Sequence, residues 1–272
     1  MLLETLSKSK IYELGHSLER DMPVYPAHPP FFMTLNNRHG DIELDCGYGS
    51  SNELVVMSGH HSTHIDALAH VSDYGKLYGG LEASDVQRGE HFKRGFRSLG
   101  VETIPPIFKR GIMLDIPRLR GKDVLDPAEA ITAEDLERAA TQQRVSIQPG
   151  DCVLIRTGWG RYWNDAPTFN GGRGGVPGPD IGAAEWLAKH QVFLTGADTV
   201  AYERRAPEIE GLPIHQFLIA KNGIYLIECL NLEELASAQV DEFLFVSLPL
   251  RLTGATGSPI RPVAIELHGG NL

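Results

Sequence analysis

The amino-acid sequence predicts one mixed α/β domain built on a substantial sheet or barrel. Three observations support this class. Apolar segments of strand length outnumber helical patterns, and the helical patterns fall mostly in the second half of the chain. No repeat, low-complexity tail or long linker divides the 272 residues. Because no glycine signature of a dinucleotide-binding fold is present, a Rossmann-like sheet is not expected, and the domain is predicted to span residues 1–272.

The first part of the chain predicts a short strand, a proline-rich loop and two further strands. Residues 10–35 read KIYELGHSLERDMPVYPAHPPFFMTL, where four prolines remove backbone donors and place the loop along a surface or an edge. Residues 53–57 (ELVVM) form a strand candidate that leads directly into a histidine-rich stretch. Residues 111–116 (GIMLDI) are another apolar run of strand length.

Capping signals predict helices in the second half. Thr132 followed three residues later by Asp135 resembles a capping box at the start of TAEDLERAA, and Asp180 caps the amphipathic segment 181–190. Residues 212–223 (LPIHQFLIAKNG) carry a proline in the first turn and Asn-Gly at the end, so they predict a third helix. Residues rich in glycine and proline predict a mobile loop at 169–180. The remaining apolar runs predict strands at 151–159, 191–198, 224–230 and 242–252.

Composition narrows the function classes. The formal net charge is −10 and the isoelectric point is near 5.5, which disfavours a general nucleic-acid-binding protein because phosphates require a basic face. The three cysteines (Cys46, Cys152 and Cys229) are odd in number and widely spaced, so they predict no disulfide framework. The chain shows no secretory signal and no apolar run near the ~20 residues that a bilayer requires. We therefore expect a cytoplasmic protein without membrane contact.

The most informative stretch is SGHHSTHIDALAH, residues 58–70, which holds four of the 11 histidines and one aspartate. His60 and His64 share a face if this segment is helical or tightly turned, and Asp66 adds an oxygen ligand. Imidazole nitrogens with a carboxylate suit zinc, manganese or iron better than calcium or magnesium. The alternative is a solvated histidine-rich loop. The close spacing of these side chains favours a metal site.

A second pair of candidate site residues, His215 and Glu228, lies far downstream of this stretch. His215 stands at the start of the predicted helix 212–223, where the positive helix end disfavours a protonated imidazole. Glu228 ends the apolar run IYLIE and needs a partner if it is buried. The residues alone are equally consistent with a buried salt bridge and with a surface position for Glu228.

These residues carry a family resemblance. HHSTHIDALAH resembles the HxGTHxDxxxH signature of the cyclase family of metal-dependent hydrolases, which includes bacterial kynurenine formamidases and isatin hydrolases. HSLERDMPVYP, VLIRTGW, GADTVAYE, HQFLIAKNGIYLIECLNLEELA and LPLRLTGATGSPIRPVAI resemble further family segments in the same order. Ser62 replaces the usual glycine, and Leu68 replaces the proline of the formamidase version. The resemblance implies a swivelling β/β/α-type single domain, with a barrel-like sheet and flanking helices, that assembles as a homodimer or homotetramer.

The resemblance also implies a ligand set. His60, His64 and Asp66 match the ligands of a first ion, and Asp66 is placed to bridge to a second ion whose other ligands match His215 and Glu228. His70 matches the catalytic histidine. One or two divalent ions per chain, zinc or manganese, are therefore expected.

The expected chemistry is hydrolysis of an amide-type C–N bond in a small molecule, such as a formamide, a lactam or a cyclic imide. A bound divalent cation makes water acidic enough to supply hydroxide near neutrality, and His70 would pass the proton to the departing nitrogen as a group that titrates near neutrality. Two alternatives stay open: a lactone hydrolase or dehydratase with the same metal site, and a non-enzymatic metal-binding protein. Tyr25, Phe31, Phe32 and Trp159 are candidates for an aromatic substrate wall, and each could equally belong to the core.

Overall fold

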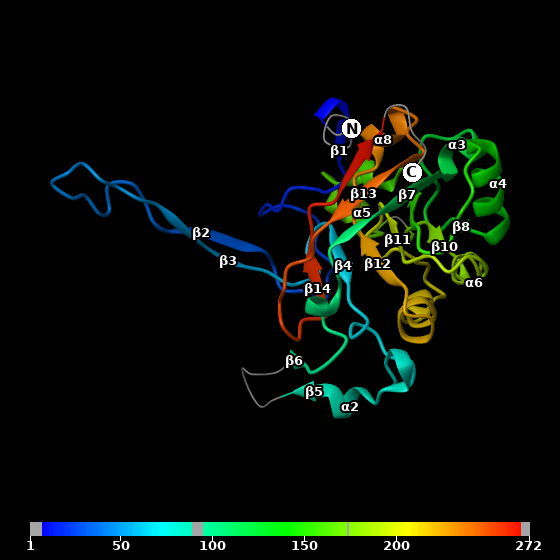
Figure 1. Cartoon of the computed structure of the whole chain (residues 1–272), viewed down its shortest axis with the longest axis horizontal. Coiled ribbons are helices and arrows are strands. Elements are labelled where there is room, and N and C mark those ends of the chain that lie inside the picture. The colour runs from blue at the N-terminus through cyan, green and yellow to red at the C-terminus, as the bar shows by residue number, and fades with distance from the viewer. Residues whose placement is uncertain (1–6, 89–94, 173, 268–272) are drawn as a thin grey trace.

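The computed structural model describes residues 7–88, 95–172 and 174–267 of the chain. A curled nine-stranded sheet occupies its centre (Figure 1). In spatial order the strands are β1 (Lys10–Glu13), β15 (Val263–Glu266), β13 (Glu242–Ser247), β7 (Ile107–Asp115), β9 (Cys152–Arg156), β11 (Leu194–Ala197), β12 (Tyr225–Glu228), β4 (His64–Asp66) and β14 (Gly257–Pro259). The predicted mixed α/β fold with a barrel-like sheet is therefore confirmed.

The middle of this sheet is parallel and buried on both faces. β7, β9, β11 and β12 run parallel, and antiparallel strands flank them on each side. Along β9 every residue is buried: Val153 and Ile155 pack in one apolar cluster, while Cys152 and Leu154 pack in another. Because successive side chains of a strand point to opposite faces, a continuous apolar run is required here, and this explains why the runs at 111–116 and 151–159 were readable as strands.

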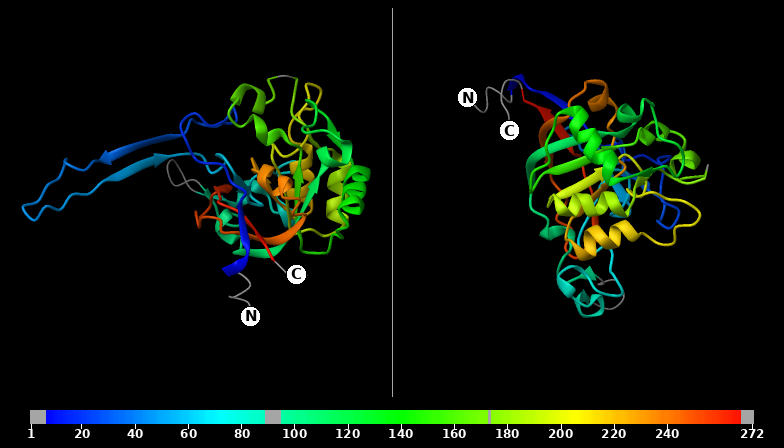
Figure 2. Two further views of the ribbon diagram at one scale, coloured as in Figure 1. Left: turned by 90° about the horizontal axis from the view of Figure 1, so that it is seen from above. Right: turned by 90° about the vertical axis from the view of Figure 1, so that its right-hand side faces the viewer.

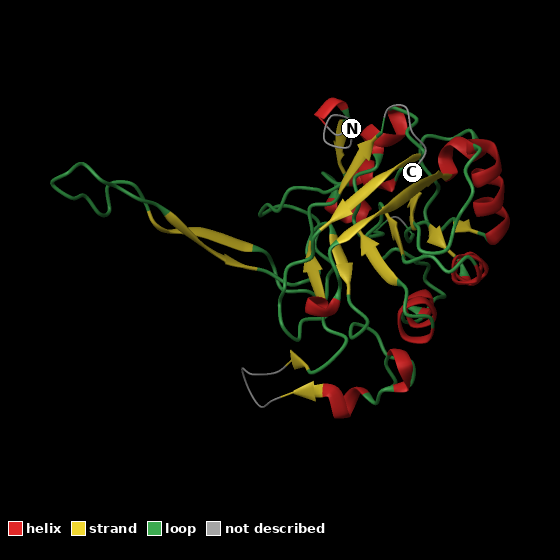
Figure 3. Cartoon of the chain, in the orientation of Figure 1, coloured by secondary structure: helices red, strands yellow, loops and turns green. Residues whose placement is uncertain are grey.

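The longest helices, at 133–143 and 181–189, cover one face of the sheet (Figure 2 and Figure 3), whereas Leu235 of the helix at 233–237 packs in the apolar cluster of the other face. Thr132 and Asp135 form the predicted capping box at the start of α4, and the Asp180 carboxylate caps α6. The segment predicted as one helix at 212–223 is a short α-helix that continues as a π-helix. The helices are α2 (Ala83–Val86), α3 (Ile116–Arg120), α4 (Ala133–Gln143), α5 (Ala166–Phe169), α6 (Ile181–Lys189), α7 (Pro213–His215), the π-helix η5 (Gln216–Lys221) and α8 (Glu233–Ser237), with 3₁₀ turns η1 (Tyr78–Gly80), η3 (Val101–Thr103) and η4 (Trp159–Tyr162).

Three small two-stranded pairs complete the structure. β8 (Ala130–Ile131) pairs with β10 (Gly178–Pro179), and β5 (Gln87–Arg88) pairs with β6 (Gly95–Phe96). β2 (Phe32–Asn37) and β3 (Asn52–Val56) form a long antiparallel hairpin that projects from the body on the side opposite α4 and α6 (Figure 1). The predicted strand at 53–57 is thus confirmed as an element, although it lies in this hairpin and not in the central sheet.

Several predicted boundaries are wrong. The strand predicted at 151–159 ends at Arg156, and Trp159 begins η4. The strand predicted at 242–252 ends at Ser247, because residues 248–252 leave the sheet as an exposed segment. β10 lies within the loop predicted at 169–180, where it pairs with β8. Within the described residues, no helix is long and apolar enough to cross a membrane. The extent of the domain, residues 1–272, stays a prediction.

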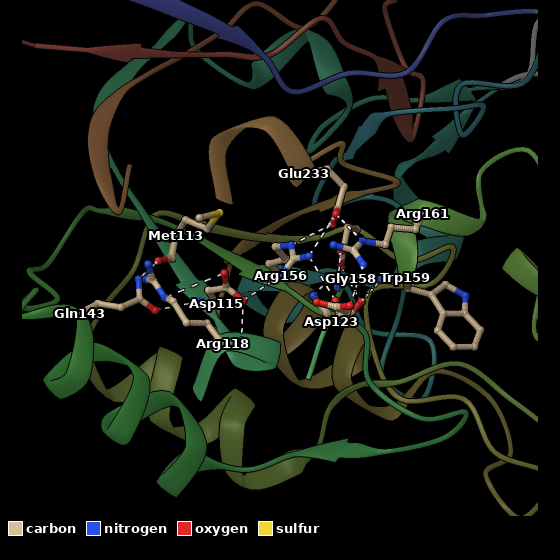
Figure 4. Close-up of polar contacts among 12 residues, drawn as sticks. Met113, Asp115, Arg118, Asp123, Gln143, Arg156, Gly158, Trp159, Arg161 and Glu233 are labelled. Atoms are coloured by element: carbon tan, nitrogen blue, oxygen red, sulfur yellow. Dashed lines mark hydrogen bonds and ion pairs between the residues drawn. The ribbon is translucent and has the colours of Figure 1, made fainter. Parts of the chain in front are cut away.

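A buried ionic network lies at the carboxyl ends of β7 and β9 (Figure 4). Arg156 is 5% exposed and donates to Asp115 at 3.0 Å and to Glu233 at 2.8 Å. Arg161 donates to the same Glu233 carboxylate at 2.6 Å. Since each buried charge has an opposite partner, the network is tolerated in the interior and ties the start of α8 to the end of β9.

Candidate metal centre and active site

Neighbouring strands bring together the histidine-rich stretch and the downstream pair. Glu228, the last residue of β12, lies directly opposite His64, the first residue of β4, in the antiparallel register. His64 and Asp66 are two residues apart on β4, so their side chains lie on one face of the sheet. His215 ends α7, whose start is set by Pro213. Of the two arrangements considered for residues 60–64, helical or tightly turned, the structure has the turn: His60 lies in it and His64 begins a strand.

Asp66 is the centre of the cluster. It is fully buried, and its Oδ1 lies 2.8 Å from His60 Nδ1 and 3.6 Å from His64 Nε2. Its Oδ2 lies 3.6 Å from His215 Nε2. Glu228 closes the group, with Oε1 2.9 Å from His215 Nε2 and Oε2 3.4 Å from His64 Nε2. All five predicted ligands therefore face one small volume.

The geometry of the structure itself indicates that the cluster fits a divalent cation. Among the described residues, both carboxylate oxygens of Asp66 are buried without a hydrogen-bond donor of suitable geometry, although burying an unsatisfied carboxylate is costly. His64 Nδ1 donates to the Ser62 carbonyl at 2.8 Å, which leaves Nε2 unprotonated and directed at the carboxylates. Nitrogen and oxygen donors in this combination suit zinc or manganese.

The candidate ligand atoms form two groups, and these groups differ from the predicted division of the ligands between two ions. His64, Asp66 and Glu228 offer ligand atoms that all lie within 4.8 Å of one another, as do His60, Asp66 and His70. Asp66 belongs to both groups, in agreement with a bridging role. The assignment of His60 with His64 to one ion and of His215 with Glu228 to another stays a prediction.

The backbone at the cluster is held in unusual conformations. Ser62 has a φ of 53°, in the left-handed region that favours glycine, which gives a physical reason for the glycine of the HxGTH signature at this position. Ser62 is held there by its hydroxyl, which donates to the His16 carbonyl at 3.1 Å. Gly257 of β14 lies so close to His60 that a Cβ would come within 2.5 Å of the ring. These two positions bring the turn and β14 tightly around His60.

Burial and charge shape the titration of the cluster. Burial lowers the pKa of His64 to about 3 and raises the pKa of Glu228 to about 7, the latter against the opposing effect of His215. Burial also disfavours the charged form of His60, but the Asp66 carboxylate raises the pKa of His60 above its usual value. Although burial opposes ionisation of Asp66, the surrounding imidazoles keep its pKa well below the usual range. The centre thus holds an ionised carboxylate among imidazoles.

His70 lies beside the ligand cluster, as its predicted catalytic role requires. Its ring stacks on His60 with the centroids 4.1 Å apart. Burial lowers the pKa of His70 to about 4, so the expectation of a group titrating near neutrality is wrong for the protein without a cation. The imidazole is neutral at pH 7 and is able to accept a proton.

A cavity of about 110 Å³ opens on this cluster. Of the four predicted wall aromatics, Tyr25 lines the cavity, while Phe31 is buried with its ring 6.4 Å from His61. The prediction that Phe32 and Trp159 line the substrate wall is wrong. Phe32 begins β2 on the projecting hairpin, where it is exposed, and the Trp159 indole is buried in the core, with its N–H donated to the Phe169 carbonyl at 3.0 Å. Apolar walls come instead from Pro23, Val200, Ala201 and Leu212.

Two residues at the site were not recognised from the sequence. His28 lines the cavity from the proline-rich loop, with its ring 5.6 Å from that of His60. Glu203 is buried and accepts from His215 Nδ1 at 2.6 Å. Neither has a spacing signal, because His28 reaches the cluster from the proline-rich loop and Glu203 from a segment twelve residues before His215. A carboxylate at the end of the buried stretch 198–203 was the one available hint for Glu203.

The comparisons with known proteins agree with this geometry. A kynurenine formamidase from Geobacillus thermodenitrificans is 26% identical over 250 residues, covering 92% of this chain and 94% of that protein. An isatin hydrolase from Roseibium aggregatum is 28% identical over 220 residues, covering 78% of this chain and 73% of that protein. A crystal structure described as a novel cyclase superposes with a TM-score of 0.85 at 27% identity, covering 97% of this chain and 91% of that one. Finally, the family model described as "Putative cyclase" matches residues 12–204, more than half of the chain, and the chain therefore belongs to the cyclase family.

Proposed function

We propose that this protein is a metal-dependent hydrolase that cleaves an amide-type C–N bond in a small molecule, of the kind found in formamides, lactams and cyclic imides. The observation that carries the proposal is the convergence of four candidate ligands, three imidazoles and a carboxylate, around Asp66, with His70 beside them and a cavity in front. The relatives named as isatin hydrolase and kynurenine formamidase support the same bond type. One or two zinc or manganese ions per chain would be held by His60, His64, Asp66, His215 and Glu228.

The protein's own residues have separable tasks in this reaction. A bound divalent cation supplies the activation of water, whose pKa it lowers from ~15.7 toward ~7. His70 accepts the proton of the attacking water, because its imidazole is neutral at pH 7, and returns that proton to the departing nitrogen. An amine without this proton is a poor leaving group. The apolar walls of the cavity keep bulk water from the reacting bond, and they are formed by Pro23, Val200, Ala201 and Leu212.

The cavity also limits the substrate. Its volume of about 110 Å³ is well below the ~300–1,000 Å³ of pockets that enclose drug-sized ligands. Tyr25 and Val200 line both this cavity and an open groove of about 430 Å³ that continues past Arg205. A substrate with a compact amide head at the cluster and a side group reaching over Tyr25 fits this arrangement.

Metal-dependent turnover of an amide tests the proposal. Purified protein is freed of metal with a chelator, reloaded with zinc or manganese, and assayed on a formanilide, a lactam, a cyclic imide and the matched lactone. We expect hydrolysis of at least one C–N substrate, its loss on chelation and its recovery on adding back the ion. Turnover confined to the lactone would identify the ester-cleaving alternative, and inertness of the loaded protein toward the whole panel would favour a non-enzymatic metal-binding protein.

A further inference from the structure

An open groove continues outward from the cavity at the candidate metal centre. Its volume is about 430 Å³, and Tyr25 and Val200 line both the groove and the cavity. Arg205 is the one charged residue among the described residues that line the groove. Its guanidinium donates to the Gly211 carbonyl, and the next residue, Leu212, forms part of the cavity wall. A cationic side chain therefore lies along the path by which the side group of a substrate leaves the cavity.

Arg205 differs from comparable arginines in its partners. Five other arginines with described side chains are buried or half-buried, and each has a carboxylate oxygen at 2.9 Å or less: Arg110, Arg118, Arg120, Arg156 and Arg204. Arg205 is also half-buried, yet it forms no ion pair with a carboxylate of the described residues. A guanidinium has several N–H donors, and the Gly211 carbonyl takes one of them. The others are left for an anion that the described residues do not supply.

The carboxylates nearest to Arg205 in the sequence do not neutralise it. Glu203 is buried and bonded to a candidate ligand histidine. Glu208 accepts from Arg204 at 2.7 Å, and Glu210 is exposed. The groove thus keeps a local positive charge, although the formal net charge of the chain is −10.

We propose that the protein acts on an amide whose side group carries a carboxylate, and that Arg205 binds this carboxylate in the groove. The inference rests on the proposed function and narrows its substrate class. The planar guanidinium presents paired N–H groups that match the two oxygens of a carboxylate. The amide head occupies the cavity at the cluster, and the side group passes Tyr25 and Val200 to reach Arg205.

A neutral side group fits the same groove less well. It displaces water from the Arg205 guanidinium without replacing the hydrogen bonds of that water, and this desolvation costs free energy. A carboxylate replaces them with charge-assisted hydrogen bonds, which are stronger than neutral ones. Because the contact lies away from the reacting bond, it holds the substrate equally in the ground state and in the transition state. The contact should therefore lower KM more than it raises kcat.

Calorimetry with two matched amines tests this subsite without requiring turnover. The first probe, para-aminophenylacetate, carries a carboxylate, and the second, para-aminophenylacetamide, has nearly the same shape without the charge. We expect the zinc-loaded wild type to bind the carboxylate at least about 10-fold more tightly than the carboxamide. Arg205→Gln should bring the two affinities to within about twofold of each other, whereas Arg205→Lys should keep part of the preference, because lysine retains the charge but not the paired donors.

Arg138→Gln is the matched control, because Arg138 is an exposed arginine of α4 and does not line the groove. It should keep the wild-type preference. A wild type that binds both amines equally, or neither of them, would overturn the proposal. So would a preference that persists in folded Arg205→Gln, because the carboxylate would then bind elsewhere, for example at the ions. If circular dichroism shows that Arg205→Gln does not fold, Arg205→Met, which keeps an unbranched side chain, must lose the preference in its place.

Turnover of the formanilides of the same two amines separates this inference from the proposed function. The preference for the carboxylate form should appear in KM, and Arg205→Gln should raise KM for that form about 10-fold. Hydrolysis of both formanilides with equal KM would overturn the anionic subsite and leave the hydrolase standing. A preference in calorimetry that depends on Arg205, without hydrolysis of any amide, would support the subsite and overturn the hydrolase.

Discussion

Replacing Asp66 with asparagine is expected to abolish both metal binding and catalysis. Asp66 is fully buried and supplies an oxygen to both groups of candidate ligands, whereas Glu228, the other carboxylate of the cluster, belongs to one of them. Asparagine has nearly the same shape, which should preserve β4 and its pairing with β12. We expect loaded and dialysed Asp66→Asn to retain almost no zinc or manganese by elemental analysis. Its kcat/KM should fall by at least about 10⁴-fold, or roughly 5.5 kcal/mol at ~1.36 kcal/mol per decade.

A matched substitution away from the cluster serves as the control for Asp66→Asn. Asp21→Asn removes a carboxylate from an exposed position in the proline-rich loop and should leave metal content and turnover unchanged. A folded Asp66→Asn protein that keeps a full complement of metal would place the ion outside this cluster. Normal metal with reduced turnover would instead make Asp66 a participant in the reaction and not a ligand.

The convergence of the candidate ligands was partly predictable, because four of the five residues carry a local signal. His60, His64 and Asp66 are close in sequence, and His215 follows a helix-starting proline. Glu228 was ambiguous from the residues alone, since the end of a strand can be buried or exposed. Its register opposite His64 decides the question, and register is a property of the assembled sheet. Glu203 had no such signal, because its contact with the site is a hydrogen bond to a residue twelve positions away.

The same distinction holds for the fold. α4 and α6 begin where Thr132 and Asp180 predict, because a cap is a contact between residues three apart. Which sheet a strand joins depends on partner strands that are distant in the sequence. β3 has an apolar composition typical of a central strand, yet it pairs with β2 in the projecting hairpin. Trp159 and Phe32 show the same limit: both are aromatic, but tertiary packing places one in the core and the other on the projecting hairpin.

Replacing His70 with alanine is expected to separate chemistry from metal binding. If His70 moves the proton, the variant should keep its fold and most of its metal but lose about 10²–10⁴-fold in kcat, or roughly 3–5 kcal/mol of barrier stabilisation. His64→Ala removes a candidate ligand, so its metal content and activity should fall together. His190→Ala removes a histidine at the end of α6 and should change neither. Added imidazole should partly restore the turnover of His70→Ala, because the deleted ring leaves a space beside His60.

The pH dependence sharpens this test. Burial lowers the pKa of His70 to about 4, and the neutral ring is the form that accepts a proton. Wild-type kcat should therefore fall as the pH decreases through this acidic range, and the profile of His70→Ala should lack that limb. Metal content must be measured across the same pH range, because protonation of the ligands also releases the ion. Loss of metal from His70→Ala at pH 7 would make His70 a ligand, in line with its place in the group formed with His60 and Asp66, and full activity of the variant would leave His70 without either role.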